Sequence, residues 1–522
     1  MQLLTRKEGV ELPNHVEEVP KEGANTGCLI LYLNCAESGS VGVKIKTNLA
    51  NLWGNVYDNC IILNVSFILA HTSQSFHKFT RESVYVSIMT SFSDVESLKT
   101  RFDISEEFGF AAEYPLSELP EYFKPWTDIA HQLKQLIDEK KLRDEVHKLP
   151  LLDHNKLKSK AEWEAAHLFL AYISQGYVWQ DGEEGIPEIL PKCLAVPFHA
   201  TSQHLQIPAS YNQFNSVLVN WRLRDPQKPF QLENLTTNVT LMGGEDEVWF
   251  FMTSLAVEKA CAPALYAIVD AQEAVYHKND SQLEASLKKM ESSILMMVKQ
   301  LKRIGDGLRP HIFYNVIRPF IAGWNAPAFQ EKGLKGLIYE GVRDEPFSFS
   351  GGTAADSSTL PALDAALGIS HQKTEDELLD DFKKYMPPKH VEFIAAVGKG
   401  PSIRDYVLNK RDSEVLAAYN RCLEAVQSFR NTHLQIVTRF IVVPASKSSK
   451  GQGKGLVGTG GTGFMQFLKG LRDSTIEALI GKEDPKGESN PQCGSPLSRY
   501  ATIATVAAIS VVTCATIWRY LR

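Results

Sequence analysis

NTHLQIVTRFIVVPAS, residues 431–446, ends a long helical pattern that decides the fold class of this chain. Apolar residues recur at intervals of three and four through this stretch and the one before it, at Leu416, Tyr419, Leu423, Val426, Phe429, Ile436, Val437 and Phe440. This spacing predicts a long helix with one buried face. His433 falls on that face, between Phe429 and Ile436. It is either a core histidine bonded to a carbonyl or a metal ligand.

The same helical periodicity extends outward from this stretch, over residues from about 98 to 480. Clusters of Gly, Pro and Asn separate the segments, strand patterns are few, and no internal repeat is found. We therefore expect an all-α body. The candidate helices cover residues 122–145, 156–175, 210–222, 248–275, 280–306, 310–324, 357–368, 374–385, 402–409, 412–444 and 463–480.

Residues 1–97 differ from this body. CLILYLNC (28–35) and CIILNVSFILAH (60–71) are β-branched and strand-like, whereas the remaining sequence is polar and lacks a sustained helical period. Three interpretations stay open: a β-rich appendage, loosely ordered sequence, or translated intron sequence. We assign no function to this extension. Residues 446–463 are rich in Gly, Ser and Lys, which predicts a mobile loop.

The C-terminal segment has the pattern of a membrane anchor. Residues 481–498 form a linker rich in Pro, Gly and Ser, and ATIATVAAISVVTCATIW (501–518) carries no charge. A helix of this length reaches about 27 Å, close to the bilayer core of about 30 Å. We expect residues 499–522 to anchor the body on the cytoplasmic face of the mitochondrial outer membrane or the endoplasmic reticulum. The alternative is a helix packed on the body.

Composition excludes several classes of protein. The net charge of −6 is spread without a basic stripe, so we expect no nucleic-acid partner. The 8 cysteines form no CxxC or CxxCH motif, which argues against zinc ribbons and covalently attached haem. Sparse cysteine favours a reducing compartment, and the first residues contain no apolar signal segment.

The candidate ligands are sparse as well. None of the 14 histidines forms HxH or HExxH, and no Walker, Rossmann or GxSxG motif is found. A single buried histidine without a companion protein ligand suits haem, which brings four nitrogens of its own. Arg430, three residues before His433, is either an ordinary surface residue or the partner of a haem propionate. Arg318 lies in apolar company, so it either snorkels or holds an anion in a dry site. Gly351 and Gly352 either allow backbone to approach a flat ligand or belong to a capped loop.

Six blocks of sequence carry a family resemblance. In their order and spacing they resemble the indoleamine 2,3-dioxygenase family, from FDISEEFGFAAEYPLSELPEYFKPW onward. The resemblance implies a two-domain helical fold that holds haem b between a small domain (98–243) and a large domain (244–480). Residues 1–97 and 499–522 lie outside it. The blocks are WFFMTSLAVE, GLIYEGV, FSGGTAADSS, KKYMPPKHVEF, HLQIVTRFIVVPAS and GTGGTGFMQFLKGLR.

The resemblance also implies roles for individual residues. His433 matches the proximal haem ligand, and Arg430 matches the arginine near the propionate. Arg318 matches the arginine that grips the substrate carboxylate, and Phe313 matches the aromatic residue that packs on the indole. Ser254 matches the distal serine, to which we assign hydrogen bonding and water placement because a hydroxyl is too weak an acid for an essential proton transfer.

Further pocket residues follow from the same match. Phe250 lies beside the distal serine, and Thr459 belongs to a loop that closes over substrate. Gly352, Thr353 and Ala354 match a Gly-Ser-Ala segment that lines the pocket, with Thr353 also next to the cofactor. The chain departs from the family at two further positions. Tyr314 stands where a second phenylalanine is usual, and Gln213 stands where a tyrosine is common, although Tyr211 is near.

The implied activity is cleavage of the indole C2–C3 bond of L-tryptophan, or of a related indoleamine, with O₂. The product would be N-formylkynurenine, in the kynurenine pathway. A cellular reductant and a monomeric protein are expected. The alternative is a non-catalytic, myoglobin-like haem protein that binds oxygen, and a helical scaffold without haem requires an unligated His433. Arg318 and Phe313 favour the enzyme, because oxygen storage needs no clamp for a carboxylate.

Overall fold

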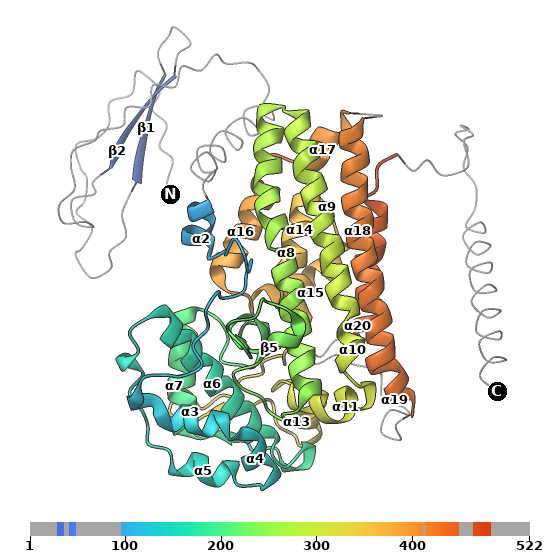
Figure 1. Cartoon of the computed structure of the whole chain (residues 1–522). Coiled ribbons are helices and arrows are strands. Elements are labelled where there is room, and N and C mark those ends of the chain that lie inside the picture. Colours follow the sequence, from blue (N-terminus) through green and yellow to red (C-terminus); the bar gives the residue numbers. More distant parts are fainter. Residues whose placement is uncertain (1–28, 36–40, 48–94, 411–412, 448–462, 482–522) are drawn as a thin grey trace, which may run out of the picture. The chain divides into compact units, whose positions relative to one another are not determined.

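A computed structural model describes residues 29–35, 41–47, 95–410, 413–447 and 463–481 (Figure 1). The chain divides into two compact units, Met1–Val84 and Tyr85–Arg522. In the first unit β1 (Leu29–Cys35) pairs with β2 (Val41–Thr47) as an antiparallel hairpin. The strand expected at 28–35 is therefore confirmed, with a partner that the sequence pattern did not indicate. The second strand-like stretch, 60–71, lies outside the described residues, as does the tail expected to be an anchor.

The second unit is mostly helical, which confirms the all-α prediction for its described residues. Short 3-10 turns and two-stranded ladders of two residues each connect the helices, and we name these only where they bear on the site. The α-helices are α2 (Val95–Phe102), α3 (Lys124–His131), α4 (Leu133–Asp138), α5 (Leu142–Lys148), α6 (Lys160–Trp179), α7 (Lys192–Leu205), α8 (Glu245–His277), α9 (Asp280–Lys302), α10 (Ile304–Gly307), α11 (Pro310–Ile312), α12 (Arg318–Phe320), α13 (Pro327–Glu331), α14 (Thr359–Leu367), α15 (Lys373–Lys383), α16 (Pro388–Lys399), α17 (Ile403–Leu408), α18 (Glu414–Val437), α19 (Val443–Lys447) and α20 (Phe464–Glu477).

Three segments adopt the wider π-helical turn. They are η4 (Phe214–Leu218), η6 (Phe313–Ile317) and η8 (Thr438–Val442). The short ladders pair β3 (Ile189–Leu190) with β6 (Ile338–Tyr339) and β4 (Arg222–Leu223) with β5 (Leu235–Thr236). Because π-turns occur often at functional sites, these segments are the first places to look for one. The helix expected at 210–222 is η4, and it is shorter than predicted.

Other differences from the predicted helices have local causes. The single helix expected over 122–145 is three helices, because Gln132 leaves helical geometry and Lys140 takes a positive φ of 55°. The sequence pattern did not predict α7 or α16. Pro197 lies inside α7 and Pro388 begins α16, and proline interrupts the sequence pattern on which the prediction relied.

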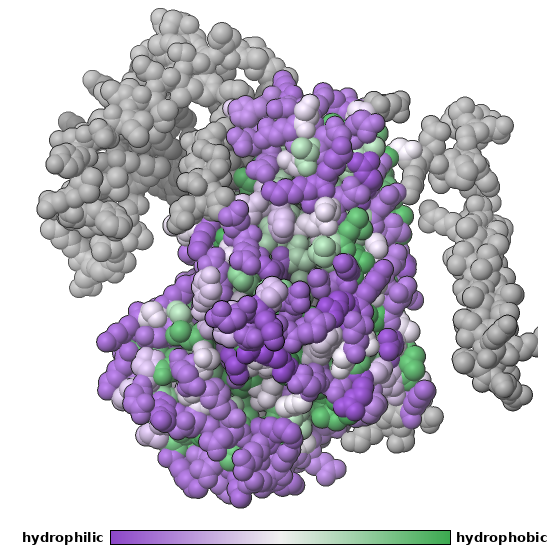
Figure 2. All heavy atoms as spheres, viewed as in Figure 1, coloured by the Kyte–Doolittle hydropathy of each residue, from purple (hydrophilic) through white to green (hydrophobic). Residues whose placement is uncertain are grey.

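The longest helices pack side by side, with α9 between α8 and α18 (Figure 1). α8 ends at Lys278 in the left-handed conformation, and the Asn279 side chain caps α9 by accepting the Gln282 N–H at 3.1 Å. Within the described residues α8 is the one helix long and apolar enough to cross a membrane, but 72% of its apolar window is buried inside the protein. It is therefore a core helix. The visible face of the described part is mostly hydrophilic, with scattered apolar residues (Figure 2).

Two hydrophobic cores lie along α8. One consists mainly of residues from α3 to η4, the first turns of α8 and the η6 region, and the other consists of α9, α14, α16, α18 and the second half of α8. Because α8 takes part in both cores, it joins the two halves of the helical unit. The division expected at residues 243 and 244 remains a prediction.

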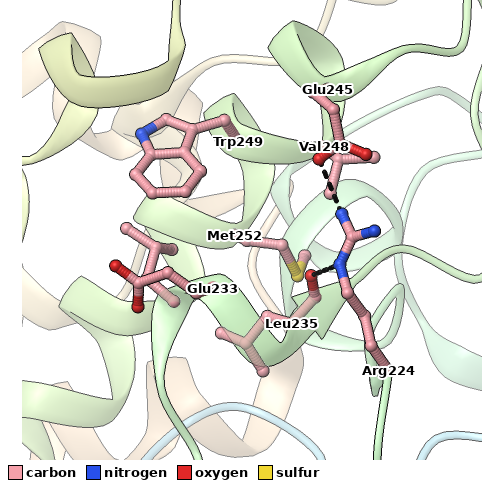
Figure 3. Close-up of a pocket in the computed structure, with 8 residues that line it drawn as sticks. Arg224, Glu233, Leu235, Glu245, Val248, Trp249 and Met252 are labelled. Atoms are coloured by element: carbon pink, nitrogen blue, oxygen red, sulfur yellow. Dashed lines mark hydrogen bonds and ion pairs between the residues drawn. The ribbon is translucent and has the colours of Figure 1, made fainter.

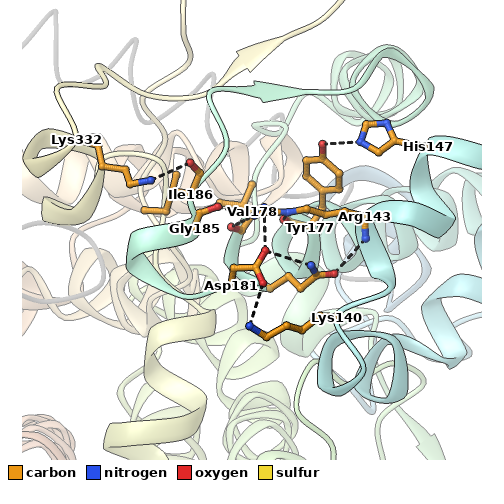
Figure 4. Close-up of polar contacts among 10 residues, drawn as sticks. Lys140, Arg143, His147, Tyr177, Val178, Asp181, Gly185, Ile186 and Lys332 are labelled. Atoms are coloured by element: carbon orange, nitrogen blue, oxygen red, sulfur yellow. Dashed lines mark hydrogen bonds and ion pairs between the residues drawn. The ribbon is translucent and has the colours of Figure 1, made fainter.

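Arg143 fixes the end of α6 in the first of these halves (Figure 4). Its guanidinium donates to the carbonyls of Tyr177 at 2.9 Å and Gly185 at 2.8 Å, and it pairs with Asp181 at 3.0 Å. The last carbonyls of a helix lack partners within the helix, so this arginine caps α6 from α5. The Arg143 guanidinium is therefore bonded and charge-balanced within the fold.

Candidate functional site

His433 lies one turn before the end of α18. The π-turn η8 follows directly after α18. Burial lowers the pKa of its imidazole to about 4, so the ring is neutral at physiological pH. The residue nevertheless keeps part of its surface accessible. Among the described residues no hydrogen bond or ion pair engages the ring, so the bond to a carbonyl that a core histidine would make is not found. The ring is therefore open to a ligand.

Aromatic rings connect the His433 helix to α8. Phe440 in η8 lies edge-on to Phe313 in η6, with ring centroids 6.2 Å apart. Phe313 in turn packs against Phe250 on α8, with centroids 4.9 Å apart. These contacts bring together two residues that the sequence assigned to one pocket, Phe250 and Phe313. Phe440, which the sequence treated only as part of an apolar stripe, is the link between them and α18.

Ser254 lies one helical turn after Phe250 on the same face of α8. Its hydroxyl donates to the Phe250 carbonyl at 3.2 Å, as helical serines commonly do. Both residues are partly exposed, although the residues between them are buried. The Phe250 ring and the Ser254 hydroxyl therefore stay partly accessible, because packing does not fully cover this stripe of α8.

Arg318 begins α12, directly after η6. Burial lowers the pKa of its guanidinium, and the Tyr314 phenol opposes that change. The guanidinium carbon lies 5.7 Å from the centroid of the Tyr314 ring, within the range of a cation–π contact. The π-turn thus places Arg318 one turn after Phe313 and Tyr314. Arg318 is partly exposed, and its role in binding an anion remains a prediction.

Arg430 pairs with a carboxylate of the chain itself, and its contact with a haem propionate remains a prediction. Its Nη2 donates to both carboxylate oxygens of Asp364 of α14, at 2.8 and 2.6 Å. It also donates to the Leu471 carbonyl and the Thr475 hydroxyl of α20. The residue is 5% exposed. Since Arg430 points to α14 and α20, it joins three helices behind His433, and in this structure its role is to hold them together.

The segment from Gly351 to Ala354 runs beside the end of η6 and α12. The Gly352 N–H donates to the Ile321 carbonyl at 3.1 Å. A Cβ at Gly352 would meet the Tyr211 ring at 2.9 Å, so a side chain there would displace an aromatic residue. The glycines are therefore required by contacts within the protein. Thr353 is partly exposed and caps η7 (Ala354–Asp356), accepting the Ala355 N–H at 3.3 Å, and Ala354 is exposed.

Two residues of the segment facing Gly352 were noted in the sequence only as departures. Tyr211 is buried, and its hydroxyl lies 3.3 Å from that of Tyr172. Gln213 is 7% exposed, and its amide donates to Glu258 at 3.3 Å. Thr459, predicted to close over substrate, lies outside the described residues. No sequence signal points to Glu258, because an acidic residue on a helix is ordinarily solvent-exposed.

A separate pocket of about 340 Å³ opens on the other face of α8 (Figure 3). Glu245, Val248, Trp249 and Met252 line it at helical spacing, and Arg224 pairs with Glu245 at 2.7 Å beside it. Its lining residues include none of those predicted for the site. The helix therefore separates this pocket from Phe250 and Ser254.

Comparison with known proteins gives a consistent result. The sequence profile of the family described as indoleamine 2,3-dioxygenase matches residues 98–478. The chain is 41% identical to indoleamine 2,3-dioxygenase 2 of Mus musculus, over 73% of this chain and 95% of that protein. The chain belongs to the indoleamine 2,3-dioxygenase family. As a member of that family it is a haem-dependent dioxygenase, an oxidoreductase.

Two further relatives bear on the function. Indoleamine 2,3-dioxygenase 2 of Homo sapiens is 39% identical, over 73% of this chain and 95% of that protein. A protein named myoglobin from Haliotis madaka is 33% identical, over 72% of this chain and 97% of that protein. The family thus contains proteins with both kinds of name.

The residues of this chain fit haem b. A neutral, accessible imidazole without a competing hydrogen bond is the ligand that haem iron takes from a protein. Among the described residues no group of three His, Cys, Asp or Glu side chains gathers around His433 or elsewhere. His433 therefore does not suit a metal ion that is held by protein ligands alone. As a member of the indoleamine 2,3-dioxygenase family, this chain would hold the haem iron through His433.

Proposed function

We propose that the protein cleaves the indole C2–C3 bond of L-tryptophan with O₂, incorporating both oxygen atoms to give N-formylkynurenine. Related indoleamines belong to the same substrate class. The observation that carries the proposal is Arg318, a guanidinium whose pKa is lowered by burial and which lies one turn after Phe313 and Tyr314, 5.7 Å from the centroid of the Tyr314 ring. A guanidinium in such a place is stabilised by an anionic ligand, and a carboxylate can accept two parallel hydrogen bonds from it.

Different residues would bind different parts of the substrate. Phe313 and Phe250 offer an aromatic wall on which an indole ring can pack. Arg318 would orient the amino-acid carboxylate, so that the ring is held at a defined height against that wall. Gly352, Thr353 and Ala354 would form the neighbouring wall, and Thr459 the loop above. Ser254 would hold a water or a polar atom of the substrate by hydrogen bonding.

Haem, when bound through His433, supplies the reactivity toward O₂ that no side chain of this protein has. The protein would contribute orientation, exclusion of water and the His433 imidazole that would hold the iron. A cellular reductant would keep the iron in its reduced state. We expect the protein to work as a monomer.

The second candidate function is reversible oxygen binding without turnover. It is favoured by the relative named myoglobin, which is nearly as long as the matched part of this chain. Arg318 and Phe313 favour the enzyme, because a store of oxygen has no use for a carboxylate clamp. The two functions differ in whether L-tryptophan is consumed.

The test uses the full chain loaded with haem. With L-tryptophan, ascorbate, methylene blue and O₂ we expect N-formylkynurenine. His433→Ala should lose both the haem Soret band and the product. Reversible oxygen binding without product would replace the enzyme with the oxygen-binding protein, and an unchanged Soret band in His433→Ala would exclude His433 as the ligand.

We also propose that residues 499–522 anchor the protein to the mitochondrial outer membrane or the endoplasmic reticulum, with the body on the cytoplasmic side. The support is the uncharged stretch 501–518 after a linker. Deleting 499–522 should move the protein to the soluble fraction while turnover stays the same. Full-length protein that is already soluble after detergent-free fractionation would exclude the anchor.

A further inference from the structure

Glu258 is a buried carboxyl that the proposed function does not use. It lies on α8 one turn after Ser254 and two turns after Phe250, on the same stripe of the helix, and it is 3% exposed. A buried carboxylate is costly unless donors surround it. Its oxygens accept hydrogen bonds from the Ser357 hydroxyl at 2.6 Å, the Thr359 hydroxyl, and the Gln213 amide at 3.3 Å.

The three donors come from different parts of the chain. Ser357 follows η7, which contains the pocket residue Ala354. Thr359 begins α14, and Gln213 immediately precedes η4. A single side chain therefore joins α8 to the pocket segment 352–357 and to the other half of the helical unit. All three donors are uncharged, so no cation shares this position.

Few other contacts hold the pocket segment, residues 352–357, on the side that faces α8. Asp356, the carboxyl of the segment itself, is 3% exposed, and neither of its oxygens has a side-chain partner among the described residues. Burial raises its pKa well above the usual range, against the opposing backbone N–H groups of Thr353 and Gln213. The donors to Glu258 are what ties this end of the segment to α8.

We propose that Glu258 is a positioning residue for the substrate pocket, holding the segment from Gly352 to Ser357 at a fixed height against Ser254 and Phe250. This rests on the proposed function, since it concerns the pocket for the indole amino acid. Glu258 does not touch the substrate. Its effect is on substrate affinity, because a loosened wall weakens binding while the haem and its axial histidine stay in place.

Glu247 is the matched control. It lies on the same helix, is 1% exposed, and accepts three hydrogen bonds of 2.8 Å. Its donors are the backbone N–H groups of residues 241–243, the segment that leads into α8. It thus equals Glu258 in burial and bonding but holds a different part of the chain. Replacing either residue costs stability, and replacing Glu258 alone should change the pocket.

The experiment compares Glu258→Gln, Thr359→Val and Glu247→Gln in the full-length haem protein. For Glu258→Gln we expect KM for L-tryptophan to rise by about tenfold, the scale of one lost hydrogen bond, with kcat nearly constant. The Soret change on L-tryptophan binding should need correspondingly more ligand. Thr359→Val should show a smaller rise in KM, and Glu247→Gln should lower the melting temperature with KM unchanged.

A second readout separates this inference from the proposed function. Hydrogen–deuterium exchange of amides 350–358 should be faster in Glu258→Gln than in Glu247→Gln, whatever the protein catalyses. Unchanged KM and exchange in Glu258→Gln, with wild-type turnover intact, would overturn the positioning role alone. Absence of wild-type turnover would overturn the proposed function, and the exchange rates would still decide whether Glu258 holds the segment. If Glu258→Gln does not fold, Thr359→Val decides by the same criteria.

Discussion

Two arginines, the buried Arg430 on α18 and the partly exposed Arg318 at the start of α12, are used in different ways. Arg430 has its charge balanced within the fold by Asp364. Burial raises the pKa of that carboxyl, but Arg430 and His371 outweigh burial and the pKa is lowered. Around Arg318 burial dominates, and it lowers the pKa of the arginine itself beside the Tyr314 ring.

This difference teaches how to separate a structural charge from a functional one. A buried ion pair such as Arg430 and Asp364 balances both charges within the fold, and its loss lowers stability. A guanidinium that pays a desolvation cost beside an aromatic ring is suited to a carboxylate from outside the chain. Sequence alone described both residues as candidate anion-binding sites. The predictions below test whether the two arginines really divide in this way.

The largest effect is expected for Asp364→Ala. Removing this carboxylate leaves the Arg430 guanidinium buried without its counter-charge, which should lower the free energy of unfolding by about 3–5 kcal/mol. Denaturant unfolding of the full-length protein measures this, and Asp364→Asn, which keeps the shape, serves as the control. A loss below about 1 kcal/mol would mean that the pair behaves as an exposed one.

Arg318→Ala should act on catalysis rather than on stability. We expect KM for L-tryptophan to rise, with a loss in kcat/KM on the order of 2–4 kcal/mol if the substrate carboxylate is desolvated in the pair. Steady-state kinetics with a melting curve for each variant make the measurement. The control is Arg309→Ala, which removes an exposed arginine paired with Asp246 from the same region. Equal effects of the two variants on KM would contradict the role given to Arg318.

The smallest effect is expected from pH. The folded-state pKa of Asp364 is lowered, so its contribution to stability is present above the unfolded value of about 3.9 and is lost as pH falls through the folded value. Protonation removes the charge but leaves the oxygens in place, so the loss should be smaller than in Asp364→Ala. Unfolding curves between neutral pH and pH 3 should show a steeper acid loss in wild type than in Asp364→Asn. Parallel curves would show that other groups govern the acid limb.

Much of the fold could be predicted because it depends on local periodicity. The long helices α8, α9 and α18 follow from apolar residues at intervals of three and four, and each was expected near its observed bounds. The pattern failed where proline or a left-handed residue changes the backbone, as at Pro197 and Lys140. The π-turns η4, η6 and η8 were not predicted, since one extra residue in a turn leaves the apolar pattern nearly unchanged.

The site was predicted in part. Placing Phe250 against Phe313 required the family resemblance, because more than sixty residues of α8, α9 and loops separate them in the chain. Phe440 completes that contact from a third segment. Glu258 could not be found at all, because its three donors belong to residues 213, 357 and 359, whose distance from α8 in the sequence carries no sign of proximity.

The sequence by itself determined the helical class, the buried face on which His433 lies, and the family to which the motifs of this chain are similar. These properties depend on residue type and on spacing within one segment. Only the tertiary structure decided that Arg430 pairs with Asp364 and that Glu258 joins α8 to the pocket segment. It also decided that Gly352 lies where a side chain would collide with the Tyr211 ring. A buried polar group is satisfied by whichever donors folding brings within about 3 Å, and those donors come from segments far apart in the chain.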